Sequence, residues 1–383
     1  MKAVAERIRA ELDPFLQQAA GEIFPAGAVH IYQNGETIYR QARGWLDVET
    51  RALPATPETL FDLASLTKVV TATAFLRLVA AGSTGLDEPV VEVLPAFSGE
   101  RPIRPYEDPL RPGHFITVSS EGRTVNAGEV TFRQLLTHSG GLPAWRPFFR
   151  QRSRQVYRRP SDEIAATLLE SFFAYGPGER VIYSDLGFML LGLAIATLTA
   201  RPLDAAVGRL VLDPLGNPAI PFGPVPAAQA APTEYCAWRG RRIRGEVHDE
   251  NAWAMGGVAG HAGLFGTAAA VASLGQAWLA DCQGANRLLP QWLAAEATGL
   301  QAEDGVVRRG LGWAAWSPDP DSASHPLSRR TFGHTGFTGT SLYVDPEREL
   351  VIACLTNEVY KGRQARQIGR LRVALHERVV EAL

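Results

Sequence analysis

A serine and a lysine three positions apart are the first residues of this chain that could do chemistry together. Ser65 and Lys68 lie at the start of a segment in which apolar residues recur at helical spacing. The segment ends at Gly82. Positions three apart share one helix face, so the hydroxyl and the amine are predicted to lie side by side. A buried amine beside a hydroxyl can activate that hydroxyl as a nucleophile.

Lysine is rare elsewhere in the chain, which favours a functional role for Lys68. The chain has 38 lysine and arginine residues, and lysine stands only at positions 2, 68 and 361. Lysine can lose its proton when it is buried, whereas arginine effectively cannot. A lysine kept in an apolar helix therefore suggests a position that needs an amine. The alternative is a lysine that extends its ammonium to the surface.

Composition describes an ordinary globular protein. Of the 383 residues, 46% are hydrophobic and 20% are charged, which excludes a disordered or fibrous chain. The net charge of −2 gives no reason to expect nucleic acid or an anionic membrane as a partner. Cys236, Cys282 and Cys354 are far apart and form neither a disulfide framework nor a metal-ligand spacing.

The N-terminal segment and the length of the apolar runs indicate where in the cell the protein is expected. Residues 1–18 read as an amphipathic surface helix without the apolar core of a signal peptide. No apolar run reaches membrane-spanning length, so no membrane span is expected. We therefore expect a cytoplasmic location, with a periplasmic or secreted one equally compatible if a leader had been removed.

Strand patterns stand at both ends of the chain and helical patterns in the middle. Residues 27–33 and 37–43 flank Asn34-Gly35, the strongest short hairpin signal. We predict an α+β fold, in which both ends build one antiparallel sheet flanked by the terminal helices. Residues 1–58 and 305–383 would form this sheet subdomain of a single domain spanning 1–383. Residues 59–304 would form an inserted, mostly helical subdomain, with the active site in the cleft between the two and an excursion at 98–128 near it.

Two further motifs follow the serine in order. Tyr183-Ser-Asp185 places a phenol and a carboxylate at a helix start, and His334-Thr335-Gly336 lies in a strand pattern. The triple resembles the class C β-lactamase, penicillin-binding protein and esterase superfamily, which carries Ser-x-x-Lys, Tyr-x-Asn and Lys-Thr-Gly or His-Thr-Gly. The resemblance implies the β-lactamase/transpeptidase-like fold and extends from about residue 25 to 358, through segments 135–143, 256–265 and 333–340.

The resemblance also implies a role for each matching residue. Ser65 would form an acyl-enzyme, and Lys68 and Tyr183 would share the work of the general base. The backbone N–H groups of Ser65 and Phe337 would form the oxyanion hole. The supporting or substrate-binding positions would be Asp185, His334, Thr335 and Gly336, where Gly336 leaves room for the substrate and His334 donates a hydrogen bond toward Tyr183 or the substrate.

Two positions depart from the β-lactamase pattern. Asp185 replaces an asparagine, and its carboxylate would keep Lys68 protonated and shift base duty toward Tyr183. Asp185 could also serve simply as a helix cap. His334 replaces a lysine, which removes a permanent cation for a substrate carboxylate. Both changes favour a neutral ester or amide, or a substrate that carries an amine.

The sequence thus predicts a serine hydrolase that acts through an acyl-enzyme on a small ester, amide or peptidic substrate, as a monomer or homodimer and without metal or cofactor. A β-lactamase or D-alanyl carboxypeptidase is the alternative, and a non-catalytic sensor of penicillin-binding type is a second. His138, His248 and His261, near Asp249, match no zinc spacing and are expected to make structural hydrogen bonds.

Overall fold

The computed structural model describes residues 2–383 except 112, 120–121, 152–160, 217–218 and 365. Eight antiparallel strands form one large sheet in the order β11-β12-β13-β14-β15-β16-β1-β2. Their bounds are β1 Ala26–Gln33, β2 Glu36–Gly44, β11 Ala302–Asp304, β12 Val307–Arg309, β13 Ala314–Ala315, β14 Phe332–Thr335, β15 Ser341–Asp345 and β16 Leu350–Thr356. Strand β1 pairs with β16, so the two chain ends build one sheet, as predicted.

The Asn34-Gly35 turn is the local reason for the first hairpin. Asn34 and Gly35 have φ values of 50° and 77°, the left-handed backbone that a two-residue hairpin turn requires. Asparagine and glycine tolerate this backbone better than other residues do. The turn sets the pairing of β1 with β2, apart from a bulge between Ile31 and Tyr32.

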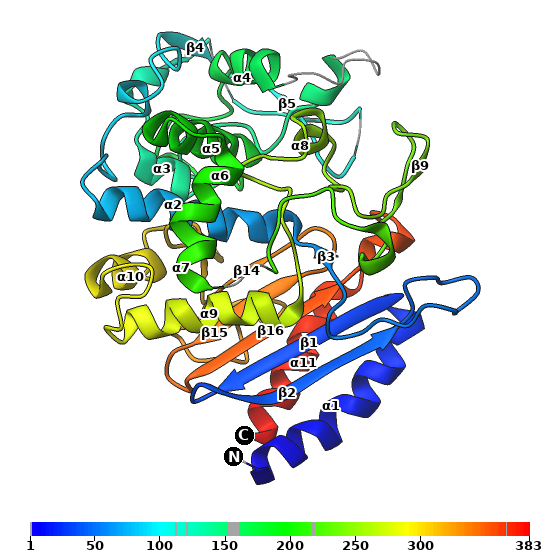
Figure 1. Cartoon of the computed structure of the whole chain (residues 1–383). Helices are drawn as coiled ribbons and strands as arrows, with labels where there is room; N and C mark the ends of the chain where they lie inside the picture. The colour runs from blue at the N-terminus through cyan, green and yellow to red at the C-terminus, as the bar shows by residue number, and fades with distance from the viewer. Residues whose placement is uncertain (1, 112, 120–121, 152–160, 217–218, 365) are drawn as a thin grey trace.

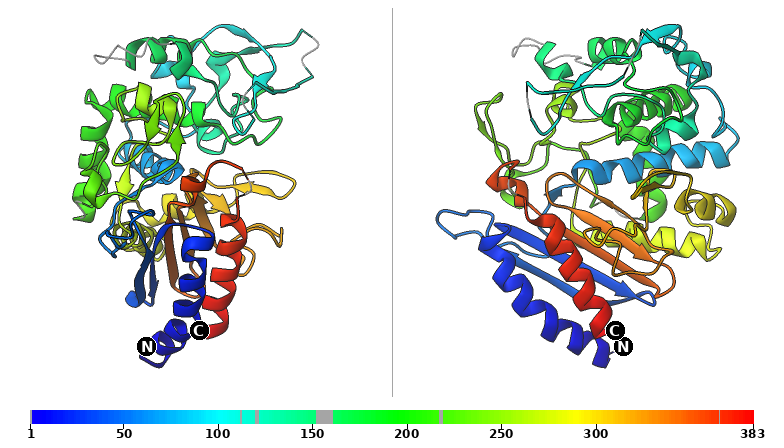
Figure 2. Two further views of the ribbon diagram at one scale, coloured as in Figure 1. Left: turned by 90° about the vertical axis from the view of Figure 1, so that its right-hand side faces the viewer. Right: turned by 180° about the vertical axis from the view of Figure 1, so that it is seen from behind.

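Alternate residues of the central strands point to two different cores. On β16, Val351 and Ala353 belong to the core that includes helix α9 (Ala268–Cys282). Ile352 and Cys354 belong to the core formed with α1 (Lys2–Glu22) and α11 (Ile368–Ala382). The two terminal helices lie side by side on one face of the sheet (Figure 2). The last helix begins at Ile368, after the short 3₁₀ turn Glu358–Lys361.

The middle of the chain is mostly helical and lies above the sheet in Figure 1. Helix α2 is buried on nearly every side and packs against α5. The 3₁₀ turn Ala64–Leu66 that precedes it, called the serine turn below, contacts β14. The helices here are α2 Thr67–Ala80, α3 Phe132–Leu136, α4 Ser161–Leu169, α5 Asp185–Thr199, α6 Leu203–Val207, α7 Asp213–Leu215, α8 Glu250–Ala254 and α10 Gln291–Thr298. The exact subdomain boundaries remain a prediction. Helix α9, which comes from the middle of the chain, packs directly on the sheet.

The excursion at residues 98–128 folds into short strand pairs. Strand β4 (Glu100–Pro102) pairs with β7 (Thr124–Asn126), and β5 (Tyr106–Glu107) pairs with β6 (Phe115–Ile116). Two further short pairs join β3 (Phe61–Asp62) to β10 (Phe265–Gly266) and β8 (Tyr235–Cys236) to β9 (Arg241–Arg242). Within the described residues no single helix is long and apolar enough to cross a membrane, although the bent pair 185–199 and 203–215 meets the criteria of length and composition together.

Candidate active site

Ser65 lies in a short 3₁₀ turn (Ala64–Leu66) that runs directly into α2. Lys68 stands in the first turn of α2 and is fully buried. Its Nζ atom donates a hydrogen bond of 2.9 Å to the Ser65 Oγ atom. The structure therefore brings the two residues together across the i, i+3 spacing that the sequence suggested.

A buried carboxylate holds the serine turn in an unusual backbone conformation. Ala64 has a φ of 46°, which costs a non-glycine residue about 1–2 kcal/mol. Asp62 accepts the Ala64 N–H at 2.8 Å through Oδ1 and the His248 N–H at 2.6 Å through Oδ2. Burial raises the pKa of Asp62, and the hydrogen bonds from these N–H groups oppose that effect. Sequence reasoning did not single out Asp62, because its partner His248 is 186 residues away.

The charge of Lys68 is set by Asp185. Burial lowers the pKa of Lys68, but the charges of Asp185 and Tyr183 outweigh burial, and the net shift is upward. The Lys68 Nζ atom lies 2.7 Å from Asp185 Oδ1 and also donates to the His261 carbonyl oxygen at 3.3 Å. Lys68 is therefore held as an ammonium ion, which donates to Ser65 and has no lone pair to accept the serine proton.

Tyr183 is positioned by the segment around His138. The His138 Nδ1 atom accepts the Ser184 N–H at 3.0 Å, and the His138 carbonyl accepts the Ile182 N–H at 2.9 Å. The His138 ring packs against the Tyr183 ring at 4.5 Å between centroids. Burial, with nearby Arg309 and Lys68, holds the pKa of His138 well below its usual range, so the ring is neutral and its Nδ1 can accept. Tyr183 is thereby fixed with its ring centroid 4.8 Å from the Lys68 ammonium.

The loop between β14 and β15 is fastened to the serine turn. The Thr338 hydroxyl donates to the Asp62 carbonyl at 2.6 Å, and the Thr340 hydroxyl donates to the Leu63 carbonyl at 3.1 Å. The Gly336 N–H is used within the loop, where it donates to the Thr340 carbonyl at 2.7 Å. For the Phe337 N–H, the described part of the chain shows no acceptor. This leaves the Phe337 N–H available beside Ser65, as an oxyanion hole requires.

His334 is buried and neutral. Its Nδ1 atom lies 2.9 Å from the Thr335 carbonyl, which can only accept, so Nδ1 carries the proton. Burial, Lys68 and Arg309 together keep the pKa of His334 well below its usual range. The Nε2 atom has no partner among the described residues. The N–H that was expected to donate toward Tyr183 or the substrate is therefore used in the contact with the Thr335 carbonyl.

Two cavities meet at Ser65, Tyr183 and Phe337, and they differ in charge. One has a volume of about 390 Å³ and is lined by Arg309, Arg366, Arg372, His334, Thr335, Gly336 and neighbouring residues. The other has a volume of about 270 Å³ and is lined by three carboxylates, Asp185, Asp249 and Glu250, by one arginine, Arg363, and by neighbours that include His261, Trp145, Pro109 and Leu110. The loop of the β5–β6 hairpin thus reaches the second cavity, near the cleft where the sequence placed it. Arg309 was missed, because nothing in its local sequence marks it.

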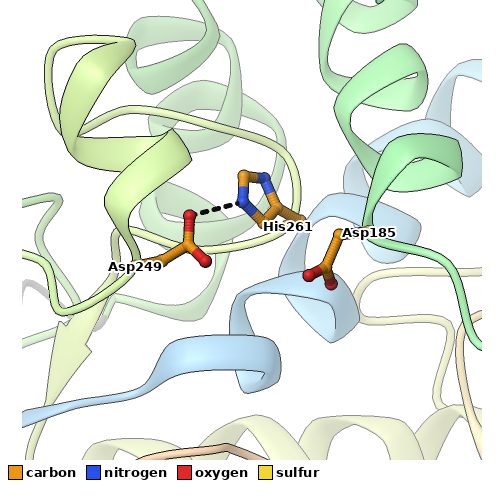
Figure 3. A group of neighbouring side chains, drawn as sticks. All are labelled: Asp185, Asp249 and His261. Carbon is orange, nitrogen blue, oxygen red and sulfur yellow. Dashed lines mark hydrogen bonds and ion pairs between the residues drawn. The ribbon is translucent and has the colours of Figure 1, made fainter. Parts of the chain in front are cut away.

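Asp185, Asp249 and His261 form the group that by residue type could hold a metal ion (Figure 3). Their candidate ligand atoms all lie within 4.8 Å of one another. His261 Nε2 lies 2.9 Å from Asp249 Oδ1. Burial raises the pKa of Asp249, but His261, the Ala252 N–H and His248 together outweigh burial, and the net shift is downward. Asp185 already pairs with the Lys68 ammonium. Asp249 thus holds the His261 ring by a hydrogen bond, and the His261 carbonyl accepts a hydrogen bond from the Lys68 ammonium. Each of the three side chains therefore already has a partner within the protein.

A nucleophilic serine, an ammonium, a tyrosine and an unpaired loop N–H in one cleft are the parts of a serine hydrolase site. A family model described as "Beta-lactamase" matches residues 12–376. The chain belongs to this family, and the protein is a serine hydrolase.

Relatives with different names resemble this chain in sequence. The chain is 28% identical to a "Putative D-alanyl-D-alanine carboxypeptidase" of Escherichia coli K12, over 97% of this chain and 88% of that protein. It is 32% identical to "Esterase EstB" of Burkholderia gladioli, over 98% of this chain and 96% of that one. The relatives thus define the class of enzyme but do not identify the bond that it cleaves.

Solved structures share the fold. EstCE1, a hydrolase with promiscuous acyltransferase activity, superposes with a TM-score of 0.71 at 22% identity, over 97% of this chain and 98% of that one. A mutant of a class C beta-lactamase superposes with a TM-score of 0.70 at 18% identity, over 99% and 97% of the two chains. At these identities the likeness concerns the fold alone, and it agrees with the predicted β-lactamase/transpeptidase-like architecture.

Proposed function

We propose that this enzyme hydrolyses an ester or amide bond through an acyl-enzyme on Ser65. The observation that carries the proposal is the arrangement of Lys68, which is held as an ammonium by Asp185 and donates a hydrogen bond to the Ser65 Oγ atom. A donor in this position orients the serine, and Tyr183 is left as the base.

The chemistry follows from the charges around Tyr183. The Lys68 ammonium and the Arg309 guanidinium lie 4.8 Å and 5.3 Å from the centre of its ring, where positive charge stabilises negative charge on the tyrosine oxygen. The Tyr183 oxygen accepts the Ser65 proton as Oγ attacks the substrate carbonyl. The N–H groups of Ser65 and Phe337 bind the developing oxyanion. Tyr183 then returns the proton to the leaving group, and a water molecule hydrolyses the acyl-enzyme by the same steps in reverse order.

A second candidate is a β-lactamase or D-alanyl carboxypeptidase. The observation that favours it is the arginine-lined cavity beside Ser65, because substrates of this class carry a carboxylate. The relative named as a putative carboxypeptidase and the relative named as an esterase support the two candidates about equally.

The proposal is tested by labelling with an activated phosphonate, followed by mass spectrometry of the intact protein. We expect one adduct on Ser65 in the wild type and none in Ser65→Ala. A wild-type protein that stays unmodified while a related hydrolase labels would contradict the proposal. Turnover of short-chain nitrophenyl esters, compared with a chromogenic cephalosporin, then separates the two candidates. Strong cephalosporin turnover with negligible ester cleavage would favour the second.

A further inference from the structure

Strands β12 and β13 separate the cavity that contains Ser65 from another cavity on their opposite face. Successive side chains of a strand point to opposite faces of a sheet. Arg309 and Ala314 accordingly line the cavity of Ser65, whereas Arg308 and Ala315 line the other one. The second cavity has a volume of about 230 Å³ and is lined in addition by the end of helix α10, so we call it the α10 cavity. The two cavities share no lining residue, so a ligand of the α10 cavity would not occupy the hydrolase site.

Positive charge gathers at the α10 cavity. Arg308, Arg329 and Arg330 line it, and no aspartate or glutamate is among the described residues that do so. The Arg308 Nε atom lies 3.4 Å from Glu303 Oε2, but the glutamate side chain is 59% exposed and solvent weakens such a pair. Within the described part of the chain, Arg329 and Arg330 have no carboxylate partner. Three guanidinium groups are thus balanced by one exposed carboxylate.

The end of helix α10 does not require these arginines. A helix C-terminus carries partial negative charge and carbonyl oxygens without helical partners, which arginines often satisfy. Here the carbonyl oxygens of residues 295 and 297 accept the N–H groups of Gly299 and Leu311 at 3.0 Å and 2.8 Å. The carbonyl oxygen of residue 296 accepts the side-chain N–H of Gln301 at 2.9 Å. The guanidinium groups therefore remain available to another acceptor.

Two further lining residues carry polar groups without partners. The Trp316 indole Nε1 and the Thr331 hydroxyl are buried and have no hydrogen-bond partner among the described residues. Both groups can donate a hydrogen bond, and buried donors are rarely left unpaired. The Arg329 guanidinium lies 5.5 Å from the centre of the Trp316 ring, and this contact holds it at the cavity without a carboxylate. The lining is therefore rich in donors and poor in acceptors, as in a site for an anion.

We propose that Arg308, Arg329 and Arg330 bind a phosphate monoester in the α10 cavity. The N–H groups of arginine match the oxygen atoms of a phosphate in pairs. A phosphate monoester carries a charge of about −1.5 to −2 at pH 7, which suits several guanidinium groups better than one carboxylate does. The volume of about 230 Å³ is several times the ~30 Å³ that one water molecule occupies in the liquid, so a phosphate group fits. The site does not depend on the function proposed for Ser65.

Calorimetry of the intact chain with glycerol phosphate, at constant ionic strength, tests the proposal. We expect one saturable site in the wild type. Arg308→Gln and Arg330→Gln should each weaken binding about 10-fold or more, as for the loss of one hydrogen bond to a charged group. Arg309→Gln is the matched control, because it removes the same charge from the opposite face of the same strand, and it should bind like the wild type. Arg330→Lys keeps the charge and should recover part of the affinity.

A phosphate monoester can belong to a small soluble molecule or to a lipid headgroup. Sedimentation with vesicles that contain phosphatidic acid, compared with pure phosphatidylcholine vesicles, identifies the lipid source. Thermal unfolding of each variant establishes that it is folded. Binding of either probe that is weakened in Arg330→Gln and kept in Arg309→Gln supports the proposal. Failure of both probes to bind, equal weakening in all the arginine variants, or a loss in Arg309→Gln alone would overturn it.

Discussion

The Lys68 ammonium and the Asp185 carboxylate form a 2.7 Å ion pair at the floor of the cleft, where the lysine side chain is fully buried and the aspartate is 18% exposed. The residues are 117 positions apart and belong to two different helices, α2 and α5. The pair fixes both the charge of Lys68 and the relative position of these helices, and the roles proposed for Ser65 and Tyr183 depend on it.

Replacing Asp185 by asparagine should destabilise the fold. The change removes the negative charge that balances a buried ammonium, and breaking a buried ion pair in this way costs about 3–5 kcal/mol. The matched control is Asp304→Asn, which breaks a more exposed pair with Arg180 and should cost about 1 kcal/mol or less. Urea unfolding at pH 7 measures both free energies. Equal small losses in the two variants would show that the Lys68–Asp185 pair does not stabilise the fold.

The contribution of the Lys68–Asp185 pair to the free energy of unfolding depends on pH. The pKa of Lys68 is raised in the folded protein, so its stabilising contribution is complete below the ordinary lysine pKa of about 10.4 and is lost as the pH rises through the raised value. In Asp185→Asn burial acts on Lys68 without the opposing carboxylate and lowers its pKa, so the stability gap to the wild type should narrow as the pH rises from the lowered pKa of the variant toward the raised pKa of the wild type. Thermal midpoints of both proteins between pH 7 and 11 measure this gap, and a gap that stays constant over the whole range would argue against a higher Lys68 pKa in the wild type.

Removing the Tyr183 hydroxyl should slow acylation while leaving the fold intact. If Tyr183 is the base, Tyr183→Phe should lower the rate of acyl-enzyme formation about 10²- to 10⁴-fold. The control Tyr32→Phe removes a hydroxyl from strand β1, outside both active-site cavities, and should retain the wild-type rate. Stopped-flow acylation by a nitrophenyl ester provides the measurement. Retention of more than about a third of the rate in Tyr183→Phe would return base duty to Lys68.

Much of the fold and the centre of the site could be predicted from local patterns. The Asn34-Gly35 turn, the strand patterns at both chain ends and the i, i+3 spacing of Ser65 and Lys68 are all encoded within a few residues. In each case the relevant physics is local, because turn geometry and helix periodicity act over short distances in the sequence.

The rest of the site depends on contacts between distant segments. Asp62 reaches the His248 N–H across 186 positions, and Arg309 meets the Tyr183 ring from another layer of the molecule. Neither residue lies in a recognisable motif. The tautomer of His334 likewise follows from its contact with the Thr335 carbonyl and from burial, neither of which a sequence pattern contains.

The loop that carries the proposed oxyanion donor should not tolerate a side chain at Gly336. A Cβ atom there would lie 2.1 Å from Thr340 Oγ1 and 2.5 Å from the Leu63 carbonyl oxygen. Gly336→Ala should therefore displace the loop from the serine turn and lower kcat at least 10-fold, since a misplaced donor loses much of its effect. Gly369→Ala is the control, because a Cβ atom at Gly369 in α11 meets nothing within 4 Å. Comparable kcat values for the two variants would exclude this role of the loop.

His376 should make the fold sensitive to mild acid at a site remote from catalysis. Burial lowers the pKa of His376 to about 4, while a backbone hydrogen bond to the Ala323 carbonyl opposes this shift. The unfolded chain binds a proton at its ordinary pKa near 6.5, so stability that is complete above pH 6.5 is lost as the pH falls toward 4. Between pH 7.5 and 5.0 the loss amounts to about 2 kcal/mol. In urea unfolding at these two pH values, His376→Gln should lose about 2 kcal/mol less than the wild type, whatever its stability at pH 7.5. Parallel losses in the two proteins would mean that His376 is protonated as readily in the folded state as in the unfolded one.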